Sequence, residues 1–165
     1  MLRLGAAEFP GLVVDDRELR QDGKSYTVLT LEALRREQPQ RPLWLLLGAD
    51  AFRGLPSWHR WRDIFRLAHV VVVPRPGVAL TEDLPAALAA ELHGRLTRDP
   101  AVLFSTPAGA IFEERVSPQP IAATAIRAQL TRGEEGRQAV AGLLPPAVLA
   151  YIDQHHLYSI PSDAT

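Results

Sequence analysis

The residues whose types and positions are best suited to ligand chemistry are Gly48, Asp50, Trp58 and Arg75. An aspartate can accept hydrogen bonds from sugar hydroxyls, and a glycine lets a ligand approach the backbone closely. An arginine presents a planar fork of donors to a phosphate or a carboxylate. The spacing of the four residues predicts that one ligand can meet all of them.

The elements around these residues explain that expectation. Leu43–Leu47 is a short, unbroken apolar run, typical of a strand covered on both faces, and Val70–Val73 repeats the pattern with β-branched residues. Between them, apolar residues recur at helical spacing over Trp58–Leu67, which predicts a crossover helix and parallel pairing of the strands. Ligands bind beyond the carboxyl ends of such strands, where Gly48–Asp50 and Arg75–Gly77 fall.

The remaining segments also alternate between strand and helix patterns, so we expect an α/β, doubly wound fold with a mostly parallel sheet, as a single domain over residues 1–165. The further predicted strands are Gly11–Asp15, Val102–Ser105 and Ala110–Glu114. The predicted helices are Met1–Ala7, Tyr26–Gln38 with Ser25 as its cap, Leu84–Leu96, Thr124–Leu130 and Ala147–His156, the last opened by Pro146.

Composition narrows the function. The chain has 165 residues, a formal net charge of -1 and no cysteine, which excludes disulfides, a thiolate nucleophile and a thiolate zinc site. Nothing in the charge indicates a nucleic-acid or membrane partner, and no segment reaches the roughly 18 to 20 apolar residues that span a bilayer. The five histidines show no metal-ligand spacing. We expect a cytoplasmic protein without a metal site of its own, and the sequence leaves a homo-oligomer open.

Each candidate residue also has a purely structural interpretation. Asp50 can cap a helix that starts at the next residue, and Gly48 can simply allow the turn before it. Trp58 and Trp61 can both be core anchors, which is the preferred interpretation for Trp61, and Arg75 can be a solvated loop residue.

Four separated segments resemble one family, the bacterial nicotinate-nucleotide adenylyltransferases of NAD biosynthesis. The segments lie in the family's order and span nearly the whole chain. They are Ser25-Tyr-Thr27 followed by Thr30-Leu31, the block from Gly48-Ala-Asp50 to Arg75-Pro-Gly77, Ile121-Ala-Ala-Thr-Ala-Ile-Arg127, and the tail Leu144–Tyr158. Any one of them is a weak signal, whereas the ordered set is specific.

The resemblance implies a nucleotidyltransferase that moves the adenylyl group of ATP onto nicotinate mononucleotide, with Mg²⁺ bound mainly through ATP phosphates. It implies that Trp58 stacks on the pyridine ring and that amides near Trp58, His59 and Thr27 hold the nicotinate carboxylate. The implied ATP-binding residues are Gly48, Asp50, Thr124 and Arg127, of which Arg127 is also catalytic; the implied mononucleotide-binding residues are Tyr26, Thr27, Trp58, His59 and Arg75.

Two departures from the family pattern stand out. The family's Gly-Gly-x-Phe-Asp-Pro-x-His-x-Gly-His phosphate loop and its strand have no counterpart, so we expect the chain to start at an internal methionine of a helix. The family's motif serine is replaced by Ala122, which removes a hydroxyl donor. Locally, Thr124 can be an N-cap with Arg127 solvated one turn later, and a plain helix start explains Tyr26 and Thr27 nearly as well.

The sequence therefore supports three hypotheses. The first is the adenylyltransferase, from which we expect negligible turnover in this chain and marginal stability with an open apolar face, because the first strand and its loop are absent. The second is a noncatalytic remnant that keeps the mononucleotide pocket. The third takes Gly48-Ala-Asp50 as the ribose-binding turn of an unrelated enzyme such as a methyltransferase, which the Arg-Pro-Gly and Thr-x-Ile-Arg segments disfavour.

Overall fold

The computed structural model describes residues 1–74, 79–116 and 121–158, and the chain divides into two compact units. The helical unit consists of Met1–Asp16 and Gln119–Thr165, and the sheet unit is Arg17–Pro118. The expectation of a single domain over residues 1–165 stays a prediction.

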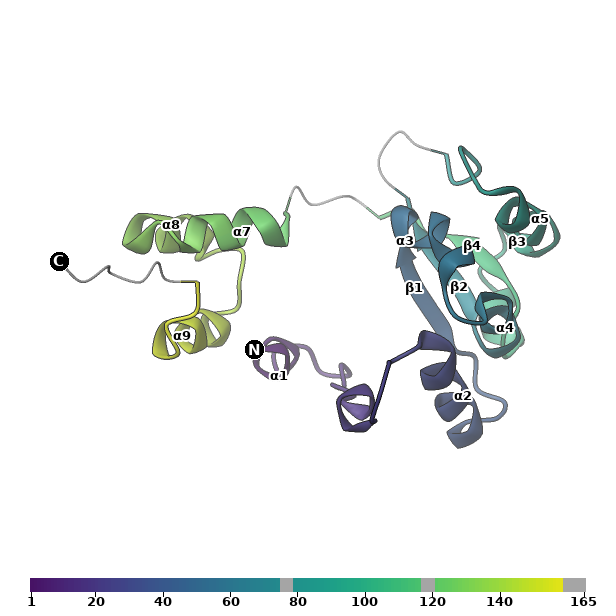
Figure 1. Cartoon of the computed structure of the whole chain (residues 1–165), viewed down its shortest axis with the longest axis horizontal. Helices are drawn as coiled ribbons and strands as arrows, with labels where there is room; N and C mark the ends of the chain where they lie inside the picture. Colours follow the sequence, from purple (N-terminus) through teal and green to yellow (C-terminus); the bar gives the residue numbers. More distant parts are fainter. Residues whose placement is uncertain (75–78, 117–120, 159–165) are drawn as a thin grey trace. The chain divides into compact units, whose positions relative to one another are not determined.

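The sheet unit is built on parallel strands in the order β1-β2-β4-β3 (Figure 1). In the register of the first pair, Trp44 lies opposite His69 and Gly48 opposite Val73. The parallel sheet and the strand-helix-strand crossover confirm the predicted α/β class. The elements in chain order are η1 (Arg17–Arg20), α2 (Thr27–Glu37), β1 (Trp44–Gly48), α3 (Ala49–Arg53), η2 (Leu55–Ser57), α4 (Trp61–Leu67), β2 (His69–Val73), α5 (Ala86–Arg95), β3 (Leu96–Thr97), α6 (Val102–Ser105) and β4 (Ile111–Glu113).

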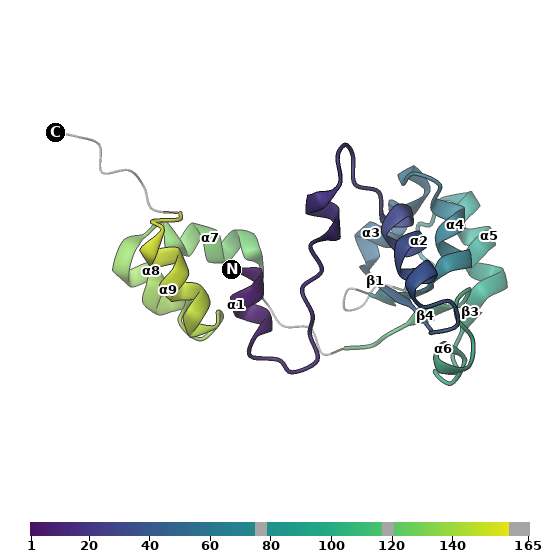
Figure 2. The same ribbon diagram turned by 90° about the horizontal axis from the view of Figure 1, so that it is seen from below.

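The two faces of this sheet are covered unequally. Helices α2, α4 and α5 bury one face, and the core residues there include Leu31, Ile64 and Leu88. On the other face of the sheet, among the described residues of this unit, the short α6 packs Leu103 against Val71. Figure 2 shows α6 apart from the three larger helices. The interior of the unit therefore lies on one side of the sheet.

Strand β1 is consequently open on one face, so the prediction that it is covered on both faces is wrong. Leu47 is buried, whereas Leu46, the residue before it, faces the opposite side of the sheet and is 64% exposed. Trp44 and Phe104 are also partly exposed there, with their rings in edge-to-face contact at 4.8 Å. A hollow of about 600 Å³ lies over this face, lined by Gln38, Arg41, Pro42, Leu43, Trp44, Leu46 and Phe104.

Two of the predicted strands are wrong. Gly11–Asp15 has no strand structure, and Leu12 and Val13 are exposed rather than paired. Val102–Ser105 is the helix α6, because the Asp99 carboxylate accepts a hydrogen bond from the Ala101 amide at 2.9 Å and starts a helical turn. Strand β4 pairs with β2 on one side and with β3 on the other. Strand β3 is Leu96–Thr97, which directly follows α5 at the end of the predicted helix.

Helix starts also differ from expectation. Helix α2 begins at Thr27 with Tyr26 as its N-cap, and the Ser25 hydroxyl contacts the Glu18 carbonyl at 3.5 Å instead of capping the helix. Helix α4 begins at Trp61 rather than at Trp58, because Trp58 has an extended backbone and Arg60 a left-handed one. Helix starts depend on single backbone angles, which periodicity does not determine.

The helical unit contains α1 (Leu2–Ala6), α7 (Ala123–Leu130), α8 (Gly133–Val140) and α9 (Pro146–Gln154). Its core is formed by Leu130, Val140, Val148 and Ile152, and an ion pair joins Arg137 of α8 to Asp153 of α9. Helices α1, α7 and α9 confirm predicted helices, and Pro146 opens α9, whereas no helix was predicted at α8. In the parts of the chain that the structure describes, no helix is long and apolar enough to cross a membrane.

Candidate functional site

The carboxyl end of β1 presents Gly48 and Asp50 at the edge of the sheet. Gly48 is the N-cap of α3 with φ -71° and ψ 158°, angles that any residue can adopt, and a Cβ there would meet no atom within 4 Å. The turn therefore does not need a glycine, and a ligand could come close to this backbone. Because α3 begins at Ala49, Asp50 lies inside its first turn, so the interpretation of Asp50 as the helix cap is wrong.

The Asp50 side chain points toward solvent. It is 61% exposed, and one carboxylate oxygen lies 3.7 Å from Nη1 of Arg53 on the same helix. An exposed carboxylate is a group that can accept hydrogen bonds from the hydroxyls of a ligand.

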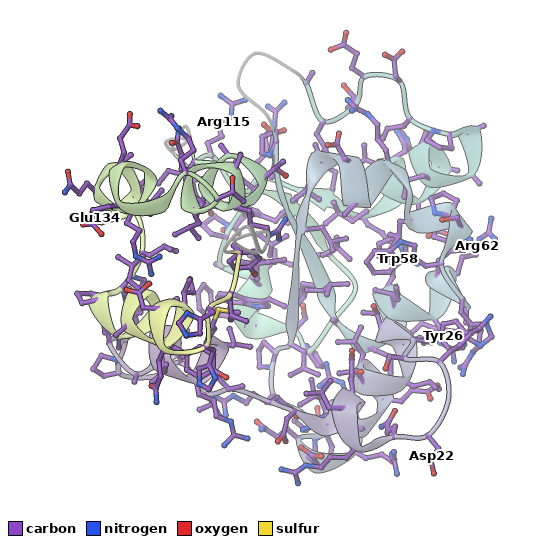
Figure 3. All side chains as sticks on the ribbon, turned by 60° about the vertical axis from the view of Figure 1, so that its left-hand side comes forward. Asp22, Tyr26, Trp58, Arg62, Arg115 and Glu134 are labelled. Carbon is purple, nitrogen blue, oxygen red and sulfur yellow. The ribbon has the colours of Figure 1, made fainter. Side chains whose placement is uncertain are left out.

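The start of α2 and the turn before α4 come together at two aromatic rings. The ring centroids of Tyr26 and His59 are 4.4 Å apart, with their planes tilted by 34°. Tyr26 and Trp58 (Figure 3) are half-buried and pack against the main core, while His59 is exposed. The structure thus brings together Tyr26, Thr27, Trp58 and His59, which are far apart in the sequence.

Backbone amides in this region differ in availability. The Trp58 amide donates to the Leu55 carbonyl at 2.9 Å and is therefore already engaged. Thr27 is the first residue of α2, where amides have no partner within the helix. Within the described part of the chain, the amides of Thr27 and His59 have no protein acceptor. These two amides, rather than that of Trp58, can receive an anion.

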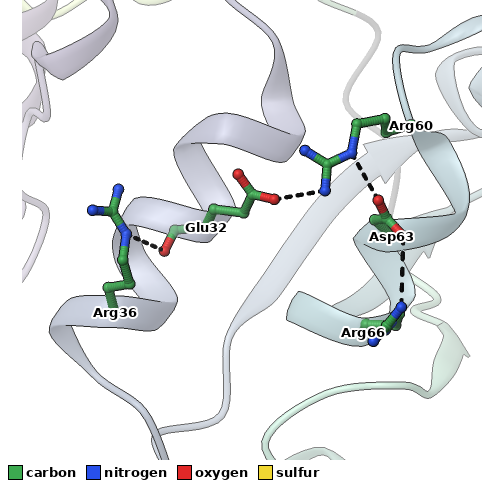
Figure 4. A network of polar contacts seen from close by, with 5 residues as sticks. All are labelled: Glu32, Arg36, Arg60, Asp63 and Arg66. Atoms are coloured by element: carbon green, nitrogen blue, oxygen red, sulfur yellow. Dashed lines mark hydrogen bonds and ion pairs between the residues drawn. The ribbon is translucent and has the colours of Figure 1, made fainter.

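Arg60 is a residue of this region that no sequence motif selects. It has φ 50° and ψ 38°, the left-handed conformation, and it caps α4. Its guanidinium contacts Glu32 of α2 and Asp63 of α4 (Figure 4). The hydrogen bonds that Arg60 donates, first to Glu32 and then to Asp63, raise the pKa of Arg60 above its usual value. No sequence pattern links Arg60 to a glutamate 28 residues away.

The predicted phosphate-contacting residues lie in the helical unit. Thr124 and Arg127 are both exposed on α7, whose N-cap is Ala122. The interpretation of Thr124 as the N-cap is therefore wrong, and its hydroxyl is not used to begin the helix.

Two further expectations concern Arg75 and a metal site. Arg75 lies outside the described residues. Over residues 1–74, 79–116 and 121–158, no group of three or more His, Asp or Glu side chains could hold a metal ion.

The sequence is similar to those of a known family and of several relatives. The sequence model of the cytidylyltransferase-like family matches residues 1–129. The chain is 49% identical, over 99% of its own length and 72% of the relative's, to a probable nicotinate-nucleotide adenylyltransferase from Laribacter hongkongensis. It is 45% identical, over 98% of its length and 71% of the relative's, to the protein of the same name from Halorhodospira halophila.

A solved structure shares the fold. The Plasmodium falciparum nicotinic acid mononucleotide adenylyltransferase complexed with NaAD superposes with a TM-score of 0.53 at 16% sequence identity. The match covers 83% of this chain and 58% of that structure, so the chain spans less than two thirds of it.

Proposed function

The chain belongs to the family of bacterial nicotinate-nucleotide adenylyltransferases, and we propose that it transfers the adenylyl group of ATP to nicotinate mononucleotide in NAD biosynthesis. The observation that carries the proposal is the 49% identity to a relative of that name over 99% of the chain. This membership excludes the hypothesis that the chain is an unrelated enzyme such as a methyltransferase.

In the proposed reaction, a phosphate oxygen of nicotinate mononucleotide attacks the α-phosphorus of ATP. The new phosphorus–oxygen bond forms as the bond to the oxygen bridging the α- and β-phosphates breaks, and pyrophosphate leaves with that electron pair. The nucleophile is already ionised, so the reaction needs no covalent enzyme intermediate. The protein's tasks are to align two anionic substrates and to stabilise the charge on the phosphates.

The mononucleotide side of the pocket is proposed to lie where α2 meets the turn before α4. Trp58 would stack on the pyridine ring, while the amides of Thr27 and His59 would hold the nicotinate carboxylate. The contact between Tyr26 and His59 supports this assignment, because it holds the two amide-bearing segments together. Arg75 is proposed to steer a phosphate or the carboxylate with its donor fork.

Nucleotide-binding roles are proposed for residues of each unit by itself, Gly48 and Asp50 in the sheet unit and Thr124 and Arg127 in the helical unit. Gly48 would allow the nucleotide to approach β1, and Asp50 would accept hydrogen bonds from ribose hydroxyls. Thr124 and Arg127 would contact the phosphates, with Arg127 as the catalytic group that stabilises charge on the transferring and leaving phosphates. Their exposure on α7 supports this role, since both side chains can reach a ligand.

Mg²⁺ is proposed to accompany ATP, bound mainly to phosphate oxygens, which are the hard ligands that this ion prefers. Oxygen coordination would withdraw charge from the phosphates as the bond to pyrophosphate breaks. A cytoplasmic location is part of the same proposal, as it is where ATP and nicotinate mononucleotide would meet the protein.

The test is to incubate the purified chain with ATP, Mg²⁺ and nicotinate mononucleotide, and to measure nicotinate adenine dinucleotide and pyrophosphate. Binding of the mononucleotide is measured in parallel by calorimetry. Product formation, much weaker with nicotinamide mononucleotide, would support the proposed reaction and overturn the expectation of negligible turnover. Binding without product would support the noncatalytic hypothesis instead. The absence of both binding and product would contradict the proposal. Equal rates with both mononucleotides would contradict recognition of the carboxylate.

A further inference from the structure

Arg60 adopts a backbone conformation that costs free energy for any residue with a side chain. Its φ of 50° lies in the left-handed region, which glycine and asparagine visit far more readily than arginine. Such a conformation persists only where the surroundings hold it, and residues of this kind cluster at ligand-binding sites. The contacts around Arg60 therefore need an explanation.

Three contacts hold Arg60 in place. Its Nη2 donates to Oε1 of Glu32 at 2.7 Å and its Nε to Oδ2 of Asp63 at 2.8 Å, both short, charge-assisted hydrogen bonds. Its carbonyl accepts a hydrogen bond from the Asp63 amide at 2.9 Å, which begins α4. Figure 4 shows Arg60 between the two carboxylates, one on α2 and one on α4.

The contribution of these ion pairs to folding stability is too small to explain why Arg60 keeps a strained backbone. The Arg60, Glu32 and Asp63 side chains are 44%, 34% and 33% exposed, and pairs that open to solvent contribute little to folding. What the pair with Glu32 does provide is a link between the turn before α4 and a helix 28 residues earlier in the chain.

Helix α2 is thereby attached to this turn at two points. Tyr26, just before α2, contacts the ring of His59, and Glu32, further along α2, binds Arg60. Thr27 lies between these two attachment points on the same helix. The position of the Thr27 amide relative to the His59 amide is therefore fixed by both contacts.

We propose that Arg60, held in its left-handed conformation by Glu32 and Asp63, is a positioning residue that sets the spacing between the Thr27 and His59 amides for the carboxylate of the pyridine ring. The inference rests on the proposed function of this pocket. Arg60 does not touch the ligand; it acts through the backbone of His59, its neighbour. It makes recognition of a carboxylate depend on an ion pair between two helices.

Two variants separate positioning from folding. Arg60→Gly can keep the left-handed backbone without steric cost but loses the tie to α2. Glu32→Leu keeps a good helix former in α2 but removes the carboxylate that binds Arg60. The matched control is Arg62→Leu, which removes another α4 arginine paired across helices, 3.5 Å from Glu91 of α5, and leaves Arg60 unchanged.

The measurement is calorimetric affinity of the purified chain for nicotinate mononucleotide, nicotinamide mononucleotide and ATP. For Arg60→Gly and Glu32→Leu we expect about tenfold weaker binding of nicotinate mononucleotide, the equivalent of about 1.4 kcal/mol, with the other two affinities changed by less than about twofold. Arg62→Leu should keep all three affinities. A loss of folding would lower all three affinities together, so the selective loss identifies positioning.

The outcomes distinguish the inference from the function on which it rests. If the parent chain binds nicotinate mononucleotide and both variants keep its preference over the amide within about twofold, the positioning role of Arg60 is wrong and the proposed function stands. The role is also wrong if the variants weaken all three ligands equally. If the parent chain does not bind nicotinate mononucleotide, the proposed function fails, and the inference fails with it.

Discussion

The ring centroids of Tyr26 and His59 lie 4.4 Å apart, although the two residues are separated by α2, β1, α3 and η2 in the sequence. This contact joins the N-terminus of α2 to the turn before α4. It makes one surface from residues that the resemblance assigned separately to mononucleotide binding.

The first prediction concerns this contact. Tyr26→Leu replaces the flat ring with a branched chain, and we expect nicotinate mononucleotide to bind between about twofold and tenfold more weakly, because an aromatic pair contributes about 0.5 to 1.5 kcal/mol. Tyr26→Phe keeps the ring and should bind like the parent. Calorimetric titration of both variants measures the difference. Equal affinity of the leucine and phenylalanine variants would show that the ring contact does not position the site.

The sequence could predict part of this site and not the rest. Trp58 is a candidate from its position and through the family resemblance, whereas Tyr26, Thr27 and His59 are candidates through the resemblance, and the structure groups these residues. The engagement of the Trp58 amide and the role of Arg60 could not be predicted, because they depend on backbone angles and on a partner in another helix. Contacts of that kind leave no spacing pattern in a single sequence.

The second prediction concerns His69, which is buried and bonded through both ring nitrogens. Its Nδ1 accepts from the Ala110 amide at 3.1 Å, so Nε2 carries the hydrogen and donates to the Thr106 carbonyl at 2.8 Å. His69→Phe fills the space but removes both hydrogen bonds, and we expect it to lower the free energy of unfolding by about 1 to 3 kcal/mol.

The exposed His93 of α5 provides the control for that change. His93→Phe should stay within about 0.5 kcal/mol of the parent, since surface substitutions rarely exceed that value. Urea unfolding followed by tryptophan fluorescence measures both variants in the sheet unit, because all three tryptophans lie there. Equal stability of the two variants would contradict a structural role for His69.

The third prediction concerns Arg35, whose guanidinium is satisfied by backbone carbonyls. It donates to the carbonyls of Leu67 at 2.6 Å, Pro107 at 2.7 Å and Arg41 at 2.7 Å, and so joins the ends of α2 and α4 to the loop before β4. Arg35→Met should lower the free energy of unfolding by about 3 kcal/mol, because several part-buried acceptors lose a charged donor.

Arg35→Lys tests whether charge alone is enough. A lysine carries the charge but not the planar fork, so we expect it to recover less than half of the lost stability. Arg36→Met, at the exposed neighbouring position, should change stability by less than about 0.5 kcal/mol in the same urea titration. Full recovery by lysine would mean that the fork geometry of Arg35 does not matter.

The fold was predictable where local signals sufficed. The apolar runs of β1 and β2, bounded by turns, fixed both strands and their parallel pairing. The exposure of Leu46 was not predictable, because a continuous apolar run looks the same whether or not a helix packs over its second face. The prediction of a strand at Val102–Ser105 is wrong because so short an apolar run, Val102 to Phe104, cannot be told from one helical turn by pattern alone.

The fourth prediction follows from the open face of β1. Leu46→Lys should leave the free energy of unfolding within about 0.5 kcal/mol of the parent while reducing self-association, since it places a charge on an exposed apolar edge. Leu47→Lys, one residue further on the covered face, should unfold the sheet unit, because it buries an unpaired charge. Light scattering over a concentration series and circular dichroism measure the two effects. Unchanged scattering of Leu46→Lys would show that this face does not promote association.

The fifth prediction concerns two helical glycines that should respond in opposite directions to the same change. A Cβ at Gly136 of α8 would collide with the carbonyl group of Gln129 on α7, so Gly136→Ala must push the two helices apart and should destabilise the helical unit by about 1 to 3 kcal/mol. A Cβ at Gly94 of α5 meets no atom within 4 Å, so Gly94→Ala should stabilise by about 0.5 to 1 kcal/mol through the better helix propensity of alanine. Thermal unfolding followed by far-ultraviolet circular dichroism gives the sign of each change. A stabilising Gly136→Ala would mean that α7 and α8 do not pack as closely as the structure has them.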